Sequence, residues 1–175
     1  MKIMKPTGSD DSRQIGRVFA IIAWLAVLFV LYWWFSRFLD RQENPNQQVY
    51  SYRDNGAAVV ELRQNPAGHY LANGFIDNHK VSFLLDTGAT QVAIPGRMAT
   101  QMRMQQGQRI QVRTANGIAT AYQTEIAELQ IGEIRLYNVA ATIVPDYDSP
   151  HVLLGMSALR ELEFSQRDRV LTIRQ

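Results

Sequence analysis

The chain has 175 residues, enough for one ordinary domain and a small additional element. Its formal charge is +2; residues 1–43 carry six Lys and Arg against four Asp and Glu, whereas residues 44–175 carry twelve of each. The larger part is therefore neutral, and we expect no nucleic-acid partner. The absence of cysteine excludes a cysteine nucleophile and a cysteine-ligated metal.

Residues 18–36 form an uncharged, strongly apolar segment. As a helix with a rise of about 1.5 Å per residue, it would nearly span a hydrocarbon core about 30 Å thick. Arg17 and Arg37 flank it, and Trp33 and Trp34 lie near one end, as interfacial aromatic residues do. The segment is longer than the apolar core of a signal peptide, and no small-residue cleavage site follows it. We therefore predict an uncleaved transmembrane anchor at residues 18–36.

The flanking charges predict how this anchor is oriented. Four basic residues precede it, whereas two follow it: Lys2, Lys5, Arg13 and Arg17, then Arg37 and Arg41. The positive-inside rule places residues 1–17 in the cytosol and the C-terminal part outside. We expect a single-pass protein of the inner (cytoplasmic) membrane whose larger domain faces the periplasm of a Gram-negative cell. Residues 37–56 are predicted as a polar linker, because residues 40–48 are polar and rich in Asn and Pro.

The remaining residues, 57–175, read as short strands separated by turn signals. The clearest turns are Asp77-Asn78, Ala115-Asn116-Gly117 and Gly132-Glu133, since Asn-Gly between alternating strands is a strong hairpin signal. A short helix is predicted at Met156–Leu162. Strands are predicted at Ala57–Leu62, His69–Ile76, Lys80–Leu85, Ile110–Thr114, Ile118–Ile126, Val139–Val144, Val152–Leu154 and Val170–Ile173. The fold class is therefore an all-β, barrel-like domain.

The most specific motif is Leu84-Leu85-Asp86-Thr87-Gly88-Ala89-Thr90, in which an apolar strand leads directly into an acid. A carboxylate at the end of a buried strand needs hydrogen bonds or charges to stabilise it, and such residues are often functional. Gly88 allows a close turn, and the Thr87 hydroxyl can donate and accept hydrogen bonds. The motif resembles the active-site loop of the retropepsin-like (clan AA) aspartic proteases.

The order of the later elements strengthens this resemblance. In the family, a hairpin flap follows the Asp-Thr-Gly loop, and an apolar-apolar-Gly strand then leads into a short helix. Here the predicted hairpin is followed by Val152-Leu153-Leu154-Gly155 and the helix at Met156–Leu162. The resemblance covers residues 57–175 and is greatest to the bacterial membrane-anchored branch. It implies a closed β-barrel acid-protease domain with one short C-terminal helix, preceded by a single transmembrane helix.

The resemblance also implies an aspartic endopeptidase that acts on protein or peptide substrates without a cofactor or metal. Two carboxylates about 3 Å apart share a proton and act as acid and base. Because the chain has one Asp-Thr-Gly, the second carboxylate must come from another copy, in a two-fold symmetric homodimer. The expected residues are catalytic Asp86, its supporting loop Thr87, Gly88 and Ala89, and the substrate-binding flap Thr114, Ala115, Asn116, Gly117 and Ile118.

The sequence departs from retroviral members of the family at two places. Those proteins pair acidic residues after Asp-Thr-Gly-Ala with an Arg after the apolar-apolar-Gly, whereas this chain has Gln91-Val92 and Met156 there. The ion pair that supports the dimer is therefore absent, and we hypothesise that the membrane anchor compensates by concentrating two copies in a plane.

Other interpretations of these residues remain open. Asp86 is also compatible with an exposed turn, and the fold with a non-catalytic periplasmic module that binds peptides. Ser157 lacks the closing glycine of a nucleophile elbow. The histidines His69, His79 and His151 lack metal-ligand spacing.

Overall fold

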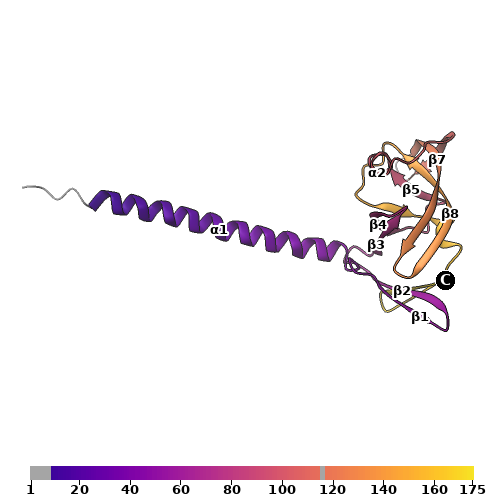
Figure 1. Cartoon of the computed structure of the whole chain (residues 1–175), viewed down its shortest axis with the longest axis horizontal. Helices are drawn as coiled ribbons and strands as arrows, with labels where there is room; N and C mark the ends of the chain where they lie inside the picture. The colour runs from indigo at the N-terminus through magenta and orange to yellow at the C-terminus, as the bar shows by residue number, and fades with distance from the viewer. Residues whose placement is uncertain (1–8, 115–116) are drawn as a thin grey trace, which may run out of the picture. The chain divides into compact units, whose positions relative to one another are not determined.

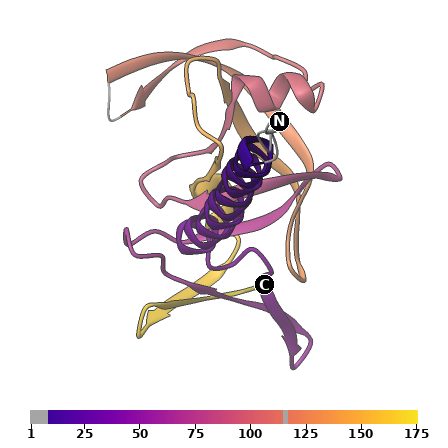
Figure 2. The same ribbon diagram turned by 90° about the vertical axis from the view of Figure 1, so that its left-hand side faces the viewer.

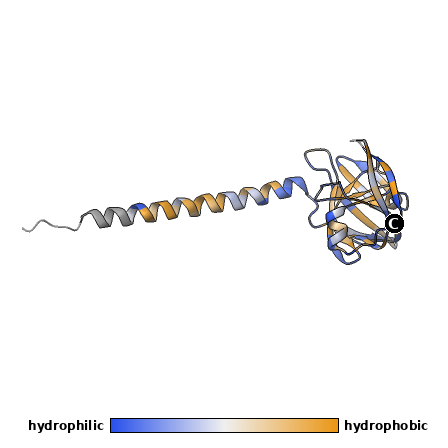
Figure 3. Cartoon of the chain, turned by 90° about the horizontal axis from the view of Figure 1, so that it is seen from above, coloured by the Kyte–Doolittle hydropathy of each residue, from blue (hydrophilic) through white to orange (hydrophobic). Residues whose placement is uncertain are grey.

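The computed structural model describes residues 9–114 and 117–175. It separates into two compact units, with the boundary between Arg41 and Gln42. Helix α1 (Ser9–Glu43) is longer at both ends than the predicted segment 18–36. From Gly16 to Glu43 it is long and apolar enough to cross a membrane. Figure 3 shows this apolar stretch in orange and the polar C-terminal end of the helix in blue.

The second unit consists mostly of strands (Figure 1). Two short helices, α2 (Gly96–Gln101) and α3 (Met156–Leu159), interrupt them. The strands are β1 (Tyr50–Asp54), β2 (Ala57–Arg63), β3 (Leu71–Ile76), β4 (His79–Leu85), β5 (Val92–Pro95), β6 (Arg109–Thr114), β7 (Gly117–Ile131), β8 (Ile134–Val144), β9 (Val152–Leu154), β10 (Glu163–Arg167) and β11 (Val170–Arg174).

These strands form two sheets. The smaller sheet is antiparallel, with the order β1-β2-β11-β10, and the larger has the order β3-β4-β9-β5-β8-β7-β6. In the larger sheet β4 runs parallel to β9, and β5 runs parallel to β8. Figure 2 shows the smaller sheet at one end of this unit and the β6–β7 hairpin at the other.

The expected all-β class is confirmed, whereas the barrel is only partly closed. Strand β3 pairs with β7 through Phe75↔Gln130 and Ile76↔Leu129, so the larger sheet curls back on itself over a short seam. The hairpin of β6 and the first part of β7 extends beyond this seam. The flap region is therefore a projecting hairpin rather than part of a continuous barrel wall.

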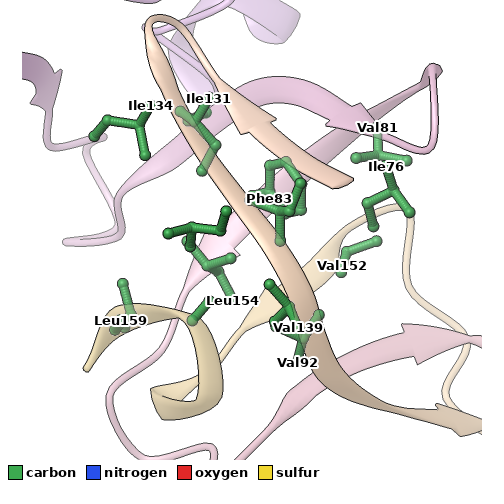
Figure 4. Close-up of a cluster of buried hydrophobic side chains, with 14 of the residues drawn as sticks. Ile76, Val81, Phe83, Val92, Ile131, Ile134, Val139, Val152, Leu154 and Leu159 are labelled. Carbon is green, nitrogen blue, oxygen red and sulfur yellow. The ribbon is translucent and has the colours of Figure 1, made fainter. Parts of the chain in front are cut away.

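Strand β4 is held in the core by its alternating apolar side chains. Val81 and Phe83 are buried, and Figure 4 shows Phe83 among Ile76, Val139 and Leu154. Burying an aromatic side chain of this size stabilises the fold by roughly 1.5–3 kcal/mol. The strand that ends at Leu85 therefore has a fixed position, and so has the residue that follows it.

Two predicted turns are present and have the backbone conformation that their residues favour. Asp77 (φ 45°) and Asn78 (φ 65°) join β3 to β4 in the left-handed region, which suits a two-residue hairpin turn. The Asp77 carboxylate also accepts a hydrogen bond from the Glu128 N–H (2.9 Å). Gly132 (φ 57°) lies between β7 and β8.

The segment predicted as a polar linker, residues 37–56, includes buried residues and strand β1. Asn46 is 4% exposed; its side-chain amide donates to the carbonyl oxygens of Leu71 (2.7 Å) and Arg63 (2.9 Å) and accepts from the Arg63 N–H (2.7 Å). Asn65 donates to the Glu43 carbonyl (2.9 Å). The compact unit begins at Gln42, earlier than the predicted start of the protease domain at residue 57. The assignment of function to residues 57–175 stays a prediction.

Several elements differ from the predicted ones. The helix predicted at Met156–Leu162 ends at Leu159, and residues 160–162 continue it as turns. The Arg160 N–H bonds to the carbonyl four residues earlier, and the N–H groups of Glu161 and Leu162 bond to carbonyls three residues earlier. Strands β5 and β10 and helix α2 were not predicted. Strand β10 is exposed along its whole length, so no alternation of apolar residues marks it.

Candidate active site

Asp86 directly follows β4, where backbone hydrogen bonds from two other segments fix the strand end. Its N–H donates to the Leu154 carbonyl on β9 (3.1 Å), and the Leu85 N–H donates to the Tyr70 carbonyl (3.0 Å). The carboxylate is half-buried, and its Oδ1 accepts the Gly88 N–H (2.8 Å). This hydrogen bond fixes the orientation of the Asp86 side chain against the backbone of its own loop.

The predicted active-site loop is a tight turn that faces solvent. The Ala89 N–H donates to the Asp86 carbonyl (3.2 Å), and this bond closes the turn. Thr87 and Gly88 are exposed, whereas Ala89 is half-buried. A Cβ on Gly88 would lie 3.1 Å from Oδ1 of Asp86, tighter than most such contacts. The loop therefore presents Thr87 and Gly88 on the surface of the domain, directly after Asp86 in the chain.

Helix α3 packs behind this loop. The N–H of Met156 donates to the Ala89 carbonyl (2.8 Å), and the N–H of Ser157 donates to the Thr90 carbonyl (3.0 Å). These bonds satisfy N–H groups at the helix start that have no partner within the helix. At Gly155 an added Cβ would lie 2.3 Å from the Gln91 carbonyl oxygen, so only glycine allows this close approach.

Ser157 is a supporting residue that the sequence analysis did not identify. It is 6% exposed; its Oγ donates to the Ala140 carbonyl on β8 (2.7 Å) and accepts the N–H of Val92, the first residue of β5 (3.0 Å). The hydroxyl thus connects α3 to both β5 and β8. Nothing in the spacing of the sequence signals this role, because the partners lie far apart along the chain.

The described residues of the predicted flap, Thr114, Gly117 and Ile118, lie on the β6–β7 hairpin. The two strands pair from Arg109↔Tyr122 to Thr114↔Gly117, and the Thr114 hydroxyl donates to the Gly117 carbonyl (2.9 Å). Ile118 is 70% exposed, which makes it an apolar side chain available to a ligand. Ala115 and Asn116 lie outside the described residues. Binding of substrate by this hairpin stays a prediction.

A family model that matches the sequence shows the family to which the chain belongs. Residues 72–161, just over half of the chain, match the model of the gag-polyprotein putative aspartyl proteases. The chain belongs to the retropepsin-like aspartic proteases. The matched region of this retropepsin-like chain contains the Asp86 loop, the β6–β7 hairpin and α3.

The chain is also similar to individual proteins. An uncharacterised Sinorhizobium protein, from the region 5′ of cobV, is 32% identical over 114 residues, which are 63% of this chain and 49% of that protein. The retropepsin-like chain thus spans about half the length of this curated relative. The crystal structure of a retropepsin-like aspartic protease from Rickettsia conorii shares the fold, with a TM-score of 0.55, 22% identity and coverage of 73% of this chain and 94% of that one. The EIAV protease in complex with the inhibitor HBY-793 has a TM-score of 0.44 and 17% identity, over 55% of this chain and 90% of that one.

Proposed function

We propose that the chain is a membrane-anchored aspartic endopeptidase in which Asp86 acts together with Asp86 of a second copy. The observation that carries this proposal is the exposed Asp-Thr-Gly loop, held by backbone hydrogen bonds at the end of a buried strand in a chain of the retropepsin-like family. One copy supplies a single such loop, so a two-fold axis beside Thr87 and Gly88 provides the second carboxylate.

The paired carboxylates would carry out both halves of acid–base catalysis. One, ionised, removes a proton from the attacking water, and the other, protonated, donates a proton to the carbonyl oxygen of the scissile bond. The Gly88 N–H, already 2.8 Å from Oδ1, keeps the carboxylate oriented. Thr87 and Ala89 brace the two loops, and the residues Thr114 to Ile118 of the hairpin cover an extended peptide by strand addition.

Helix α1 would anchor the enzyme in the inner membrane with its N-terminus in the cytosol. Near its C-terminal end the Arg37 guanidinium lies 5.3 Å from the centre of the Trp33 ring, and Trp34 stacks on Phe38 with ring centroids 6.0 Å apart. Aromatic and basic residues of this kind are typical of the membrane–water interface. The protease domain would then face the periplasm, where its substrates are periplasmic or membrane-proximal proteins.

The test compares the full chain with the variant Asp86→Asn, which keeps the shape of the side chain but removes its proton chemistry. Each is reconstituted in lipid vesicles and incubated with a peptide library over acidic to neutral pH, with cleavage detected by mass spectrometry. We expect cleavage by the wild type and a loss on the order of 100-fold or more in the variant. A wild type that binds peptides but never cleaves them would identify a peptide-binding module instead.

A further inference from the structure

The junction between α1 and the strands, residues 43–47, is held against the second unit by asparagine side chains. Asn46 is 4% exposed, and its amide bonds to backbone groups at the end of β2 and at the start of β3. Asn44 is also buried; its amide N–H donates to Oδ1 of Asn73 (3.0 Å), and its Oδ1 accepts the Asn46 N–H (2.9 Å). A buried amide that lost such partners would cost free energy, so these bonds fix the position of the junction.

Both ends of the junction are held in the same way. The Glu43 carbonyl accepts the side-chain amide N–H of Asn65 (2.9 Å), and the Glu43 carboxylate lies 3.2 Å from Nε2 of His151, the residue before β9. The Gln47 carbonyl accepts the side-chain amide N–H of Asn73 (3.0 Å). The junction is therefore part of the folded second unit and does not act as a flexible spacer.

The apolar part of α1 ends close to this junction. Its uncharged stretch ends at Ser36, and the helical residues 37–43 lead from there to the junction. At about 1.5 Å per residue these residues span roughly 10 Å. In the proposed anchored protein, Glu43 therefore lies at most about 10 Å beyond the hydrocarbon edge, close to the lipid headgroups, whatever the angle of the helix.

The junction is also close to the candidate site. The Asn46 amide bonds to the carbonyl of Leu71, and Leu71 pairs with Leu84, which precedes Leu85 and Asp86 at the end of β4. Paired strands lie about 5 Å apart, and a strand rises about 3.3 Å per residue. With the length of the Asn46 side chain included, Asp86 lies within roughly 20 Å of the Asn46 backbone.

We propose that this protease cleaves other membrane proteins, in the extended segments next to their membrane spans. This substrate class rests on the proposed function, a membrane-anchored endopeptidase, and concerns the same Asp86 site. The two distances together place Asp86 within roughly 30 Å of the hydrocarbon edge. An extended chain that leaves the membrane covers this distance in about ten residues.

A fixed height above the membrane favours such substrates over others. A protein in the same membrane meets the site at a high effective concentration, provided that its cleavage site lies at a height that the enzyme reaches. A segment close to a span meets this condition, whereas a segment at the end of a long, stiff stalk does not. A flexible spacer of about 60 residues would let the domain move over roughly 40 Å and would remove the difference. The buried asparagines thus make the anchor a limit on height.

The test uses two model substrates, each with one membrane span, reconstituted in lipid vesicles with the full chain. Both carry the same peptide, selected from the library that tests the proposed function. In the near substrate the peptide follows the span after a flexible Gly-Ser segment of about 15 residues; in the far substrate a semi-rigid helical spacer of about 40 residues holds it roughly 60 Å away. We expect the wild type to cleave the near substrate at least several-fold faster than the far one.

A matched enzyme variant shows whether the fixed junction causes this preference. It carries a flexible Gly-Ser insertion of about 60 residues between Arg41 and Gln42, the boundary of the two units, and so keeps the asparagine bonds of the junction. We expect this variant to cleave the free peptide as the wild type does, and the near and far substrates at rates within about three-fold of each other.

The outcomes separate the substrate class from the proposed function. Equal rates on both substrates by the wild type, which needs no variant, would overturn the substrate class. A preference that the insertion leaves unchanged, or cleavage of the free peptide but of neither anchored substrate, would also overturn it, and all three results leave an endopeptidase in place. If the wild type cleaves none of the three substrates faster than Asp86→Asn does, the proposed function itself is wrong.

Discussion

Replacing Gly155 by alanine adds one methyl group at the closest contact between α3 and the Asp86 loop. The Cβ would lie 2.3 Å from the Gln91 carbonyl oxygen and 2.7 Å from the Ala89 carbonyl oxygen. An unstrained contact between carbon and oxygen is about 3.3 Å or longer, so one segment must move by about 1 Å. The backbone of Gly155 (φ −90°, ψ −174°) is extended and open to any residue, so the effect is steric.

The expected magnitude follows from what this movement disturbs. Forcing one methyl group into a packed site costs about 1–3 kcal/mol. The neighbouring bonds from Met156 to Ala89 (2.8 Å) and from Ser157 to Thr90 (3.0 Å) contribute about 1 kcal/mol each. A loss of roughly 2–5 kcal/mol lowers the melting temperature by on the order of 10 °C. If the Asp86 loop is catalytic as proposed, a displacement of about 1 Å there costs on the order of 100-fold in kcat/KM.

The assay measures thermal unfolding of the second unit in the full chain and cleavage of a library-selected peptide well below the melting temperature. Gly132→Ala is the matched control, because its Cβ would lie 2.7 Å from the Ser51 Cβ and 3.1 Å from the Val60 Cγ2, a clash with the smaller sheet rather than with β4 or the Asp86 loop. We expect a similar loss of stability from both substitutions but a much larger loss of cleavage from Gly155→Ala. Equal losses of cleavage, or an unchanged melting temperature for Gly155→Ala, would refute the reasoning.

Three further substitutions have defined outcomes. Ser157→Ala leaves the buried Val92 N–H without its hydroxyl partner and removes the bond to the Ala140 carbonyl, so the free energy of unfolding should fall by about 1–3 kcal/mol in denaturant titration. We expect kcat to fall while KM changes less. Asn46→Ala removes one buried and two partly buried hydrogen bonds, so the melting temperature should fall by several degrees or more, and no change would mean that this segment is dispensable for stability. Ile118→Ser should raise KM for apolar peptides while leaving the melting temperature within about 2 °C, because this side chain is exposed; unchanged kinetics would remove the hairpin from substrate binding.

The parts that sequence predicted well depend on local signals. Strand β4 was marked by its apolar run, and the turn after it by the glycine two residues beyond Asp86, and both patterns lie within a few residues of each other. The hairpin turn at Asp77-Asn78 was marked by residues that tolerate the left-handed conformation. Each of these features is decided by neighbours along the chain, and a single sequence contains that information.

The features that were missed depend on contacts between distant segments. Ser157 bonds to Val92, which lies 65 residues away along the chain. Asn46 bonds to Arg63 at the end of β2, 17 residues later, and to Leu71 at the start of β3, 25 residues later. A composition that suggests a linker therefore also fits a buried hydrogen-bonding segment. Strand β10 has no apolar alternation, and the turn after it uses Asp168 (φ 48°) and Arg169 (φ 64°) without glycine or asparagine.

The most direct test of the central claim mixes wild-type chain with Asp86→Asn at a fixed total amount in vesicles, after both have been dissolved together in detergent. If each active site needs one Asp86 from each of two copies, cleavage falls as the square of the wild-type fraction, to about a quarter at equal mixing. If one copy is sufficient, cleavage falls in direct proportion, to about a half. The quadratic decrease is the predicted result, and a linear decrease would contradict a catalytic dyad shared between two chains.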